Sequence, residues 1–578
     1  MKKLMLGNAA VARGAYEAGV KVVSSYPGTP STEITENIVK YEDVYVEWAP
    51  NEKVACETAI GASIAGARAM TCMKHVGLNV MADPVFTVSY IGVNGGLVLC
   101  VADDPGMHSS QNEQDSRHYA RASKIPMLEP SNSQECKDFT KLAFELSEKF
   151  DTPVFIRLST RVSHSQSLVE EVEPTTVELK PYEKNIAKNV MMPANAIQRH
   201  VVVEKRQEEL VKYAQTTALN VIENNGAKIG VITSGVSYEY AKEALGDKVN
   251  YLKLGMVYPL SEKLIKDFTQ TVEEIYIIEE LDPFIEEYVK SLGISVKGKE
   301  VFSLLGEYSQ TLIKKVILGE KVENLSTDKV LPKRPPVMCA GCPHRGTFYT
   351  LKKLGVTVSG DIGCYTLGAV APLSIVDTTI CMGASISAAH GMVKARGKDF
   401  SKKLVAVIGD STFIHSGVTG LIDIVYNKNN NTVIILDNSI TGMTGHQENP
   451  TTGLTIRNEP TKQVDLVALC KAVGVSRVRV EDPFDVKGFE KAVKEELSID
   501  EPSVIIARRP CALLKGVKYD GKFTVNNEKC RSCKMCMRLG CPAITFVDGK
   551  AKIDATQCNG CGLCANVCPF GAIERGDE

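Results

Sequence analysis

Residues 404–437 are the stretch that most constrains the fold of this chain. Two short apolar runs rich in β-branched residues, 404–408 and 432–436, flank a helical stretch at 416–427. Runs of this length and composition are typical of buried strands, and their spacing is that of a strand–helix–strand unit. The two strands of such a unit lie parallel in a buried sheet, so we predict an α/β fold.

Each strand of this unit is followed by a side chain with an oxygen donor. Gly409, Asp410 and Ser411 follow the first strand, and Asn438 comes 28 positions after Asp410. Open α/β sheets bind ligands at the carboxyl ends of their strands, and these two ends should emerge side by side. Carboxylate, amide and backbone carbonyl oxygens suit Mg²⁺ that also holds phosphates, and Gly409 allows close approach to a diphosphate. A common turn and a helix cap are the alternative interpretation.

This arrangement closely resembles the thiamine diphosphate motif of the 2-oxoacid:ferredoxin oxidoreductases, in which Gly-Asp-(Gly or Ser) is followed further on by Asn. The resemblance implies that the chain binds thiamine diphosphate with Mg²⁺. It also implies that Asp410, the Asn438 amide and the Ile440 carbonyl hold the metal, and that Gly409 and Ser411 contact the cofactor.

Length, charge and cysteine content limit the class of protein. At 578 residues the chain is too long for one core, and its net charge of −2 does not indicate nucleic acid or an anionic membrane as a partner. Residues 1–8 resemble a signal peptide only faintly, and the longest apolar region, 367–390, carries Asp377, which argues against a membrane span. Eight cysteines between Cys530 and Cys568 need reduced thiols, which predicts a cytoplasmic, anaerobic setting.

A glutamate begins a helix early in the chain. The strand predicted at 44–48 leads to Glu52 and to a helix so rich in small residues that a neighbour must pack very near it. This resembles the pyrimidine domain of thiamine enzymes and implies that Glu52 is catalytic, hydrogen-bonded to N1′ of the aminopyrimidine. A surface carboxylate favoured by the helix dipole is the alternative, and Glu57 is a second candidate for the catalytic role.

A rigid turn at 26–31 follows the strand predicted at 21–25, with Ser31 as a candidate N-cap of the next helix. It resembles the family's Tyr-Pro-x-Thr-Pro-Ser turn, which implies that Thr29 approaches the substrate and the reacting carbon. A plain proline turn is the alternative.

A long polar loop, 103–117, follows the strand predicted at 96–101, and irregular loops of this kind at strand ends are usually functional. Its sequence resembles the indolepyruvate:ferredoxin oxidoreductases in particular, whose large subunit this chain resembles along its whole length. His108 and Arg117 are candidates for the substrate site, with ordinary loop roles as the alternative.

The C-terminal tail carries two copies of Cys-x2-Cys-x2-Cys, each followed by a further Cys-Pro. This is the internal repeat of a bacterial two-cluster ferredoxin, in which each 4Fe-4S cluster takes three thiolates from one copy and one from the other. The first copy has one residue more than usual before its last cysteine, which removes no ligand, and zinc is the alternative metal. The predicted ligands are Cys530, Cys533, Cys536 and Cys568 for cluster 1, and Cys558, Cys561, Cys564 and Cys541 for cluster 2.

A third cluster is implied by resemblance alone. In the related pyruvate enzymes a Cys-x-x-Cys, a third cysteine and a fourth on the last strand of the domain bind a 4Fe-4S cluster near the thiamine. The interval between the second and third cysteines is shorter here, and a zinc site or free buried thiols are the alternatives. The matching positions are Cys339, Cys342, Cys364 and Cys511.

The resemblance also predicts the domain organisation. Charged, proline-containing residues at 165–200 and the prolines of 332–336 indicate connectors. The predicted parts are a pyrimidine-binding thiamine domain, a linker with a transketolase-C-terminal-like α/β domain, a diphosphate- and Mg²⁺-binding thiamine domain, and an α+β ferredoxin domain, at residues 1–180, 181–325, 326–520 and 521–578.

The reaction implied by this resemblance is oxidative decarboxylation of indole-3-pyruvate and other arylpyruvates to aryl-acetyl-CoA and CO2. Coenzyme A would be the co-substrate and ferredoxin the electron acceptor. A smaller β subunit would complete an αβ complex with two copies of each chain, with no nucleic acid or membrane partner. The alternatives are the same chemistry on another 2-oxoacid such as pyruvate, and an electron-transfer subunit whose thiamine site has decayed.

Overall fold

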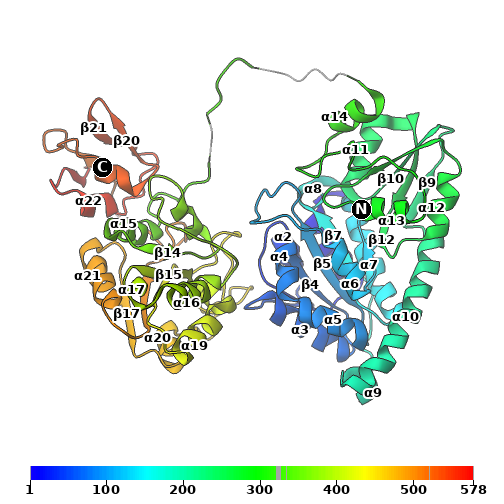
Figure 1. Ribbon diagram of the computed structural model, residues 1–578, viewed down its shortest axis with the longest axis horizontal. Coiled ribbons are helices and arrows are strands. Elements are labelled where there is room, and N and C mark those ends of the chain that lie inside the picture. Colours follow the sequence, from blue (N-terminus) through cyan, green and yellow to red (C-terminus); the bar gives the residue numbers. More distant parts are fainter. Residues whose placement is uncertain (1, 321–326, 333–334, 520, 577–578) are drawn as a thin grey trace. The chain divides into compact units, whose positions relative to one another are not determined.

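The computed structural model describes residues 2–320, 327–332, 335–519 and 521–576. Contacts within it divide the chain into two compact units, Met1–Asp328 and Lys329–Glu578 (Figure 1). The predicted domain borders at 325/326 and at residue 520, and residues 333–334 of the predicted linker, lie outside the described residues. Among the described residues, no helix has both the length and the apolar character that crossing a bilayer requires.

The first unit is built on a seven-stranded sheet with the order β12-β6-β7-β5-β4-β2-β3, in which every neighbouring pair is parallel except β12 with β6. Three of these strands confirm the predictions made at 21–25, 44–48 and 96–101. In sheet order the strands are Met256–Tyr258, Met127–Leu128, Val154–Ser159, Leu97–Asp103, Ala69–Lys74, Val22–Ser25 and Tyr45–Trp48.

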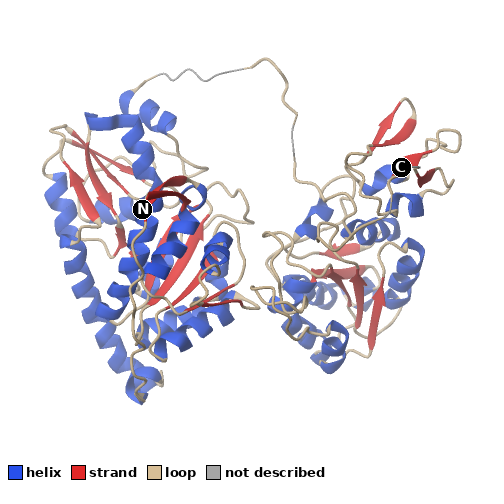
Figure 2. Ribbon diagram, turned by 180° about the vertical axis from the view of Figure 1, so that it is seen from behind, coloured by secondary structure: helices blue, strands red, loops and turns tan. Residues whose placement is uncertain are grey.

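Helices lie on both faces of this sheet (Figure 2). β5 and β7 are buried along their whole length, as expected for parallel strands covered on both sides. The helices are α1 (Gly7–Glu17), α2 (Thr32–Ile38), α3 (Glu52–Ile64), α4 (His75–Val80), α5 (Ala82–Ile91), α6 (Arg117–Ser123), α7 (Ser133–Phe150) and α8 (Thr160–His164).

A smaller four-stranded sheet, β13-β10-β11-β9, completes the first unit and lies within the residues 181–325 predicted to hold a second α/β domain. β12, which follows β11 in sequence, pairs with β6 and thereby joins the larger sheet. The strands in sheet order are Glu274–Ile278, Ile229–Thr233, Asn250–Leu254 and Asn220–Glu223, and the helices are α10 (Pro193–Thr216), α11 (Gly235–Leu245), α12 (Glu262–Thr269) and α13 (Phe284–Ser291).

The prediction of a connector at 165–200 is wrong at both of its ends. Residues Gln166–Glu170 form β8, which pairs antiparallel with the N-terminal strand β1, Lys2–Leu6. The helix α10 then begins at Pro193 and buries Val203 and Leu210. The strand pairing joins segments about 160 residues apart, so no local pattern in either segment could indicate it.

The second unit contains a five-stranded parallel sheet, β14-β15-β16-β18-β17. The predicted strand–helix–strand unit is confirmed as β15, the helical turns from Asp410 to Tyr426 and β16. The strands in sheet order are Thr357–Ser359, Leu404–Gly409, Thr432–Asp437, Ser503–Arg508 and Arg477–Glu481, and the main helices are α15 (His344–Leu354), α16 (Ala384–Arg396), α19 (Val418–Tyr426), α20 (Leu466–Ala472) and α21 (Val486–Leu497).

The tail of the second unit is α+β. β19 (Phe523–Val525) pairs antiparallel with β22 (Ile573–Arg575), and β20 (Ile544–Val547) pairs with β21 (Lys550–Ile553). Its apolar core includes Leu539, Leu563 and several cysteines, so the thiols are part of the packing.

Candidate functional site

Asp410 lies at the carboxyl end of β15, beside the end of the parallel strand β16. Its side chain is 2% exposed and accepts hydrogen bonds from the Ser411 and Ser439 backbone N–H groups, at 2.9 and 3.1 Å. Burial, and then the charge of Asp437, raise the pKa of Asp410 to about 7. Within the part of the chain that the structure describes, no cationic side chain forms an ion pair with this buried carboxylate.

Two more oxygen-bearing groups lie beside this carboxylate. The Asn438 amide lies 3.3 Å from Asp410 Oδ1 and 2.8 Å from the Ile440 carbonyl oxygen, where its nitrogen donates to both. Rotation of the amide would present its oxygen instead, and the three oxygens would then form the hard donor set that Mg²⁺ prefers. The predicted metal ligands are thus brought together.

Gly409 is required by the packing of a neighbouring aromatic ring, whereas the sequence predicted that it allows a diphosphate to approach the backbone. A Cβ at this position would lie 2.7 Å from Cε1 of the Tyr365 ring, so the aromatic ring occupies the space that a side chain would need. The prediction that the backbone of Gly409 approaches a diphosphate remains a prediction. Ser411 is buried, and its hydroxyl oxygen accepts a hydrogen bond of 3.0 Å from Thr441.

Glu52 is the first residue of α3 and is 5% exposed. The preceding Asn51 caps the helix by accepting from the Val54 N–H at 2.9 Å. A Cβ at Gly77, in α4, would lie 2.5 Å from Glu52 Oε1, so the glutamate is enclosed by a helix that only glycine allows to come so close. Glu57 is instead exposed and paired with Lys53, which removes it as the alternative.

Thr29 lies in the turn after β2 and is half-buried. The turn is fixed by the Asn8 amide, which donates to the Pro30 carbonyl at 2.6 Å. Ser31 occupies the N-cap position of α2, but its hydroxyl donates to the Gly28 carbonyl at 2.8 Å and makes no capping bond to the helix. The geometry therefore holds Thr29 in a rigid turn in the same unit as Glu52.

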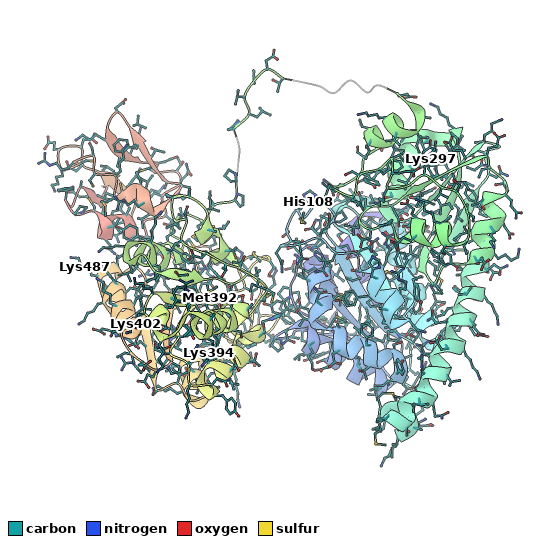
Figure 3. All side chains as sticks on the ribbon, viewed as in Figure 1. His108, Lys297, Met392, Lys394, Lys402 and Lys487 are labelled. Carbon is teal, nitrogen blue, oxygen red and sulfur yellow. The ribbon has the colours of Figure 1, made fainter. Side chains whose placement is uncertain are left out.

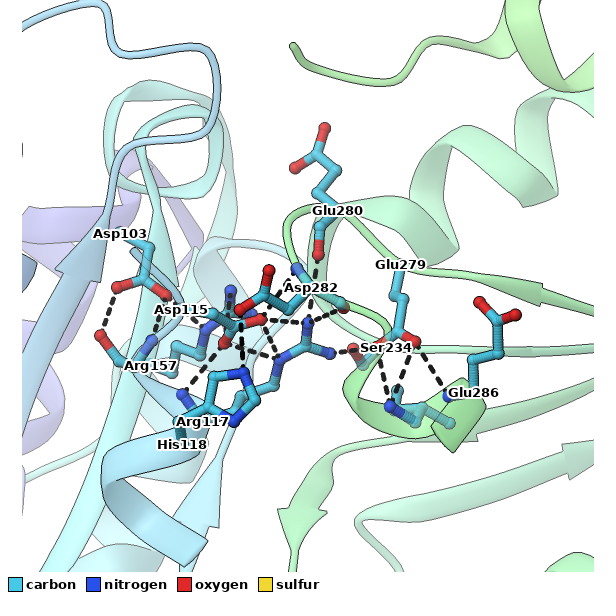
Figure 4. A network of polar contacts seen from close by, with 12 residues as sticks. Asp103, Asp115, Arg117, His118, Arg157, Ser234, Glu279, Glu280, Asp282 and Glu286 are labelled. Carbon is cyan, nitrogen blue, oxygen red and sulfur yellow. Dashed lines mark hydrogen bonds and ion pairs between the residues drawn. The ribbon is translucent and has the colours of Figure 1, made fainter. Parts of the chain in front are cut away.

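The guanidinium of Arg117 is engaged in ion pairs with buried carboxylates (Figure 4), so Arg117 is not a substrate-site residue. It is 1% exposed and pairs with Asp115 and with Glu279, which lies 162 positions further on at the end of β13. Arg157 pairs with Asp103 at 2.8 Å in the same network. These contacts join α6 to the smaller sheet and give Arg117 a structural role.

His108 lies on the exposed loop after β5 (Figure 3), where Nε2 is 3.0 Å from a Glu307 carboxylate oxygen. About half of its side chain is exposed. This surface pair does not support the predicted role of His108 in the substrate site.

The tail cysteines gather in two groups. Cys530, Cys533, Cys536 and Cys568 line one cavity together with Phe546 and Ile573. In the other group, burial and then the neighbouring thiols Cys561, Cys541 and Cys558 raise the pKa of Cys564 to about 12. Each group holds three cysteines of one copy of the repeat and one of the other copy.

Cys339, Cys342, Cys364 and Cys511 also lie close together. Burial, and then the adjacent Cys511 and Cys339, raise the pKa of Cys364 to about 11. Cys342 likewise lies near Cys364 and Cys339. These four cysteines come from three separate segments of the second unit, so the fold assembles a group that the sequence spacing alone could not.

Three residues at these sites were missed from the sequence. Lys74 ends β4, near Glu52, and His75 begins α4, the helix whose Gly77 lies against Glu52; neither belongs to a recognisable motif. Arg345 is buried between the cysteine groups, where it donates to the carbonyls of Cys339 at 3.1 Å and Leu539 at 2.8 Å. Its position at the start of α15, beside a Cys-x-x-Cys, was the only sequence signal.

Comparison with known families finds three matches. Residues 13–229 match the family "Pyruvate flavodoxin/ferredoxin oxidoreductase, thiamine diP-bdg". Residues 361–507 match "Thiamine pyrophosphate enzyme, C-terminal TPP binding domain", and residues 551–574 match "4Fe-4S binding domain". The segments that carry Glu52, Asp410 and the second cysteine repeat fall within these three matches.

Comparison with curated proteins finds relatives over nearly the whole chain. Indolepyruvate oxidoreductase subunit IorA of Archaeoglobus fulgidus is 41% identical, over 99% of this chain and 97% of that protein. The subunit of the same name from Pyrococcus horikoshii is 42% identical, with the same coverage of both chains. The 2-oxoglutarate synthase subunit KorA of Methanocaldococcus jannaschii is 26% identical over 46% of this chain and 85% of its own length. This chain therefore belongs to the family of indolepyruvate oxidoreductase IorA subunits, among the 2-oxoacid:ferredoxin oxidoreductases.

Proposed function

We propose that this chain is the catalytic large subunit of an enzyme that oxidatively decarboxylates indole-3-pyruvate and other arylpyruvates. The balanced reaction consumes the 2-oxoacid, coenzyme A and two oxidised ferredoxins, and yields the aryl-acetyl-CoA, CO2, a proton and two reduced ferredoxins. The observation that carries the proposal is the buried Asp410 carboxylate, which lies beside the Asn438 amide and the Ile440 carbonyl and forms no ion pair with any described residue.

The residues present fit thiamine diphosphate with Mg²⁺. The oxygens of Asp410, Asn438 and Ile440 would hold the metal, and Ser411 would lie against the diphosphate. When bound, the cofactor supplies an electron sink for decarboxylation of a 2-oxoacid. Glu52, enclosed by α4, would hold the proton at N1′ of the aminopyrimidine and exclude water from it. Thr29, in its fixed turn, would orient the substrate.

The cysteine groups fit iron–sulfur clusters. Each of the two tail groups offers four thiols in the spacing of a two-cluster ferredoxin, and we assign them to two 4Fe-4S clusters. Bound there, such clusters carry single electrons at potentials of roughly −400 mV, which suits a ferredoxin acceptor. We assign a third, proximal cluster to Cys339, Cys342, Cys364 and Cys511, because the fold brings these four thiols together.

Several parts of the assembly follow from this proposal. A smaller β subunit would complete the enzyme, in an α2β2 arrangement. The need of the clusters for reduced thiols supports a cytoplasmic, anaerobic setting for the complex. The smaller sheet of the first unit would be a transketolase-C-terminal-like domain with a packing role, since Arg117 joins it to α6.

The experiment is anaerobic reduction of a one-electron dye by the chain purified with its β subunit. The assay contains Mg²⁺, thiamine diphosphate, coenzyme A and either indolepyruvate or pyruvate. We expect faster reduction with indolepyruvate and loss of at least 100-fold in kcat with Glu52→Gln, a typical size for a general acid or base. Faster reduction with pyruvate would show that the preferred substrate is not indolepyruvate. If complexes with intact clusters reduce no dye, the enzymatic proposal is rejected in favour of an electron carrier.

A further inference from the structure

Lys74 is a cation at the carboxyl end of β4 that the proposed mechanism does not use. β4 lies next to β2 in the sheet, and β2 leads into the turn that carries Thr29. The stem of the lysine packs against that turn, because a Cβ at Gly28 would lie 3.2 Å from Lys74 Cγ. The carboxylate of Glu52 is near enough to oppose loss of the lysine's proton. Lys74 thus lies beside both catalytic candidates of the first unit.

The ammonium of Lys74 is only partly used by the protein. Nζ donates one hydrogen bond, of 2.8 Å, to the Ser109 carbonyl in the loop after β5. An ammonium has three N–H donors, so two of them make no hydrogen bond to any residue that the structure describes. Within the described residues Lys74 takes part in no ion pair, whereas Arg117 and Arg157 each pair with at least one carboxylate at hydrogen-bond distance.

The loop carboxylate whose charge acts on Lys74, that of Asp104, is engaged in other hydrogen bonds. Asp104 is 1% exposed, and it accepts from the Ser109 N–H, the Ser110 hydroxyl and the Thr160 hydroxyl at 2.8, 2.7 and 2.6 Å. Although burial acts against it, these hydrogen bonds and then the charge of Lys74 hold the pKa of Asp104 below its ordinary value. Asp104 therefore stays charged and helps to keep Lys74 protonated without pairing with it.

We propose that Lys74 binds the carboxylate of the 2-oxoacid substrate, using the two N–H donors that the protein leaves free, next to Glu52 and Thr29. This inference rests on the proposed function. It gives the site a charged anchor for the acid group that all 2-oxoacids share, and leaves discrimination between side chains to other residues.

A purely structural role is the competing interpretation, because Lys74 also holds the loop at Ser109. The neighbouring His75 holds the same loop independently, through Nε2 at 3.1 Å from the Asn112 carbonyl. Loss of Lys74 should therefore leave the loop attached. A second lysine, Lys180, serves as a control: it also donates to a backbone carbonyl, that of Asn94 at 3.0 Å, and belongs to no part of the proposed site. It differs from Lys74 in that it also pairs with Glu148 at 3.4 Å.

The first test measures binding without turnover. Indole-3-propionate, which has the carboxylate but no ketone, and its neutral amide are titrated calorimetrically into the holo complex of wild type, Lys74→Met, Lys74→Arg and Lys180→Met. We expect wild type and Lys180→Met to prefer the acid by roughly 10- to 100-fold, the range for a hydrogen bond to a charged group. Lys74→Met should lose that preference, and Lys74→Arg should keep most of it.

The second test uses steady-state kinetics and pH. Lys74→Met should lower kcat/KM for indolepyruvate by about as much as it lowers the preference for the acid, mainly through KM, while thiamine diphosphate and the clusters remain bound.

Burial, opposed by the charges of Asp104 and Glu52, lowers the pKa of Lys74 to about 8. Since the protonated form binds the acid, kcat/KM of wild type should fall as the pH rises above about 8, and this decline should disappear in Lys74→Arg.

The outcomes separate this inference from the proposed function. If wild type reduces no dye with any 2-oxoacid, the proposed function fails. If wild type is active but does not distinguish the acid from the amide, or if Lys74→Met weakens both ligands equally or neither, only the role of Lys74 is wrong.

Discussion

Each of the two large sheets of this protein buries a carboxylate where a central parallel strand ends. One carboxylate pairs with an arginine, whereas the other accepts hydrogen bonds from neutral groups. Asp103, at the end of β5, is fully buried and paired with Arg157 at 2.8 Å, within the network that includes Arg117 and Asp115. Asp410, just after β15, is almost as buried but receives only neutral donors. The paired cluster, Asp103, Asp115, Arg117 and Arg157, has a structural role. Asp410 has the Asn438 amide and the Ile440 carbonyl beside it, and a cation is expected there.

The largest effect should come from breaking the paired cluster. Arg117→Met leaves Asp115 and Glu279 buried without their partner, and we expect the free energy of unfolding to fall by about 3–5 kcal/mol. Trp48, the only tryptophan, lies in β3 of the same unit, so its fluorescence in urea reports this loss. The control is Arg161→Met, whose ion pair with Glu307 has a half-exposed arginine and should contribute less than about 1 kcal/mol. Equal losses in the two variants would contradict the comparison.

Glu280 tests whether an unpaired carboxylate inside the paired cluster behaves as Asp410 does. Burial raises the pKa of Glu280 to about 7, against a hydrogen bond from the Tyr308 N–H. A raised folded-state pKa contributes stability that is full below the unfolded value and is lost as the pH rises through about 7. Glu280→Gln should therefore match wild type near pH 4 and be more stable at pH 8, on the order of 1–3 kcal/mol. A constant difference across this range would rule out Glu280 as its source.

Asp410 and its neighbour Asp437 allow the comparison to be made within one sheet. Without metal, Asp410→Asn removes an uncompensated charge and should leave the second unit as stable or more stable, by up to about 1 kcal/mol. Asp437→Asn should destabilise it by a similar amount, because Asp437 accepts from Arg508 at 2.7 Å. Hydrogen exchange of the amides of β15 and β16 measures both changes. The same sign for the two variants would contradict the account.

The smallest effect is expected at Glu57. Its carboxylate is exposed and its partner Lys53 is also at the surface, so Glu57→Gln should change neither the midpoint of thermal unfolding nor dye reduction. Loss of activity in this variant would reopen the choice between Glu57 and Glu52.

Local patterns predicted those parts of the molecule that depend on neighbours in sequence. The β15–β16 unit follows from two β-branched runs at the right spacing, and it carries Asp410 and Asn438 with it. The tail cysteines follow from a repeat whose geometry is dictated by the metal. Both patterns are complete within a few tens of residues, which is why sequence alone could reveal them.

Contacts between distant segments were not predictable in this way. The role of Arg117 depends on Glu279, 162 positions away, and β1 depends on its partner strand β8, about 160 positions further along the chain. The enclosure of Glu52 depends on Gly77, and the position of Lys74 depends on the order of strands in the sheet. The roles of such residues can be assigned only when the topology is known.

The most direct test of the central claim is a calorimetric titration of Mg²⁺ with thiamine diphosphate into the anaerobic complex, comparing wild type, Asp410→Asn and Asp437→Asn. The account predicts one site per chain in wild type, retained in Asp437→Asn and weakened at least 100-fold in Asp410→Asn, since loss of a ligand to a bound cation costs several kcal/mol. Undiminished binding by Asp410→Asn would show that the unpaired carboxylate is not the metal ligand and would contradict the account.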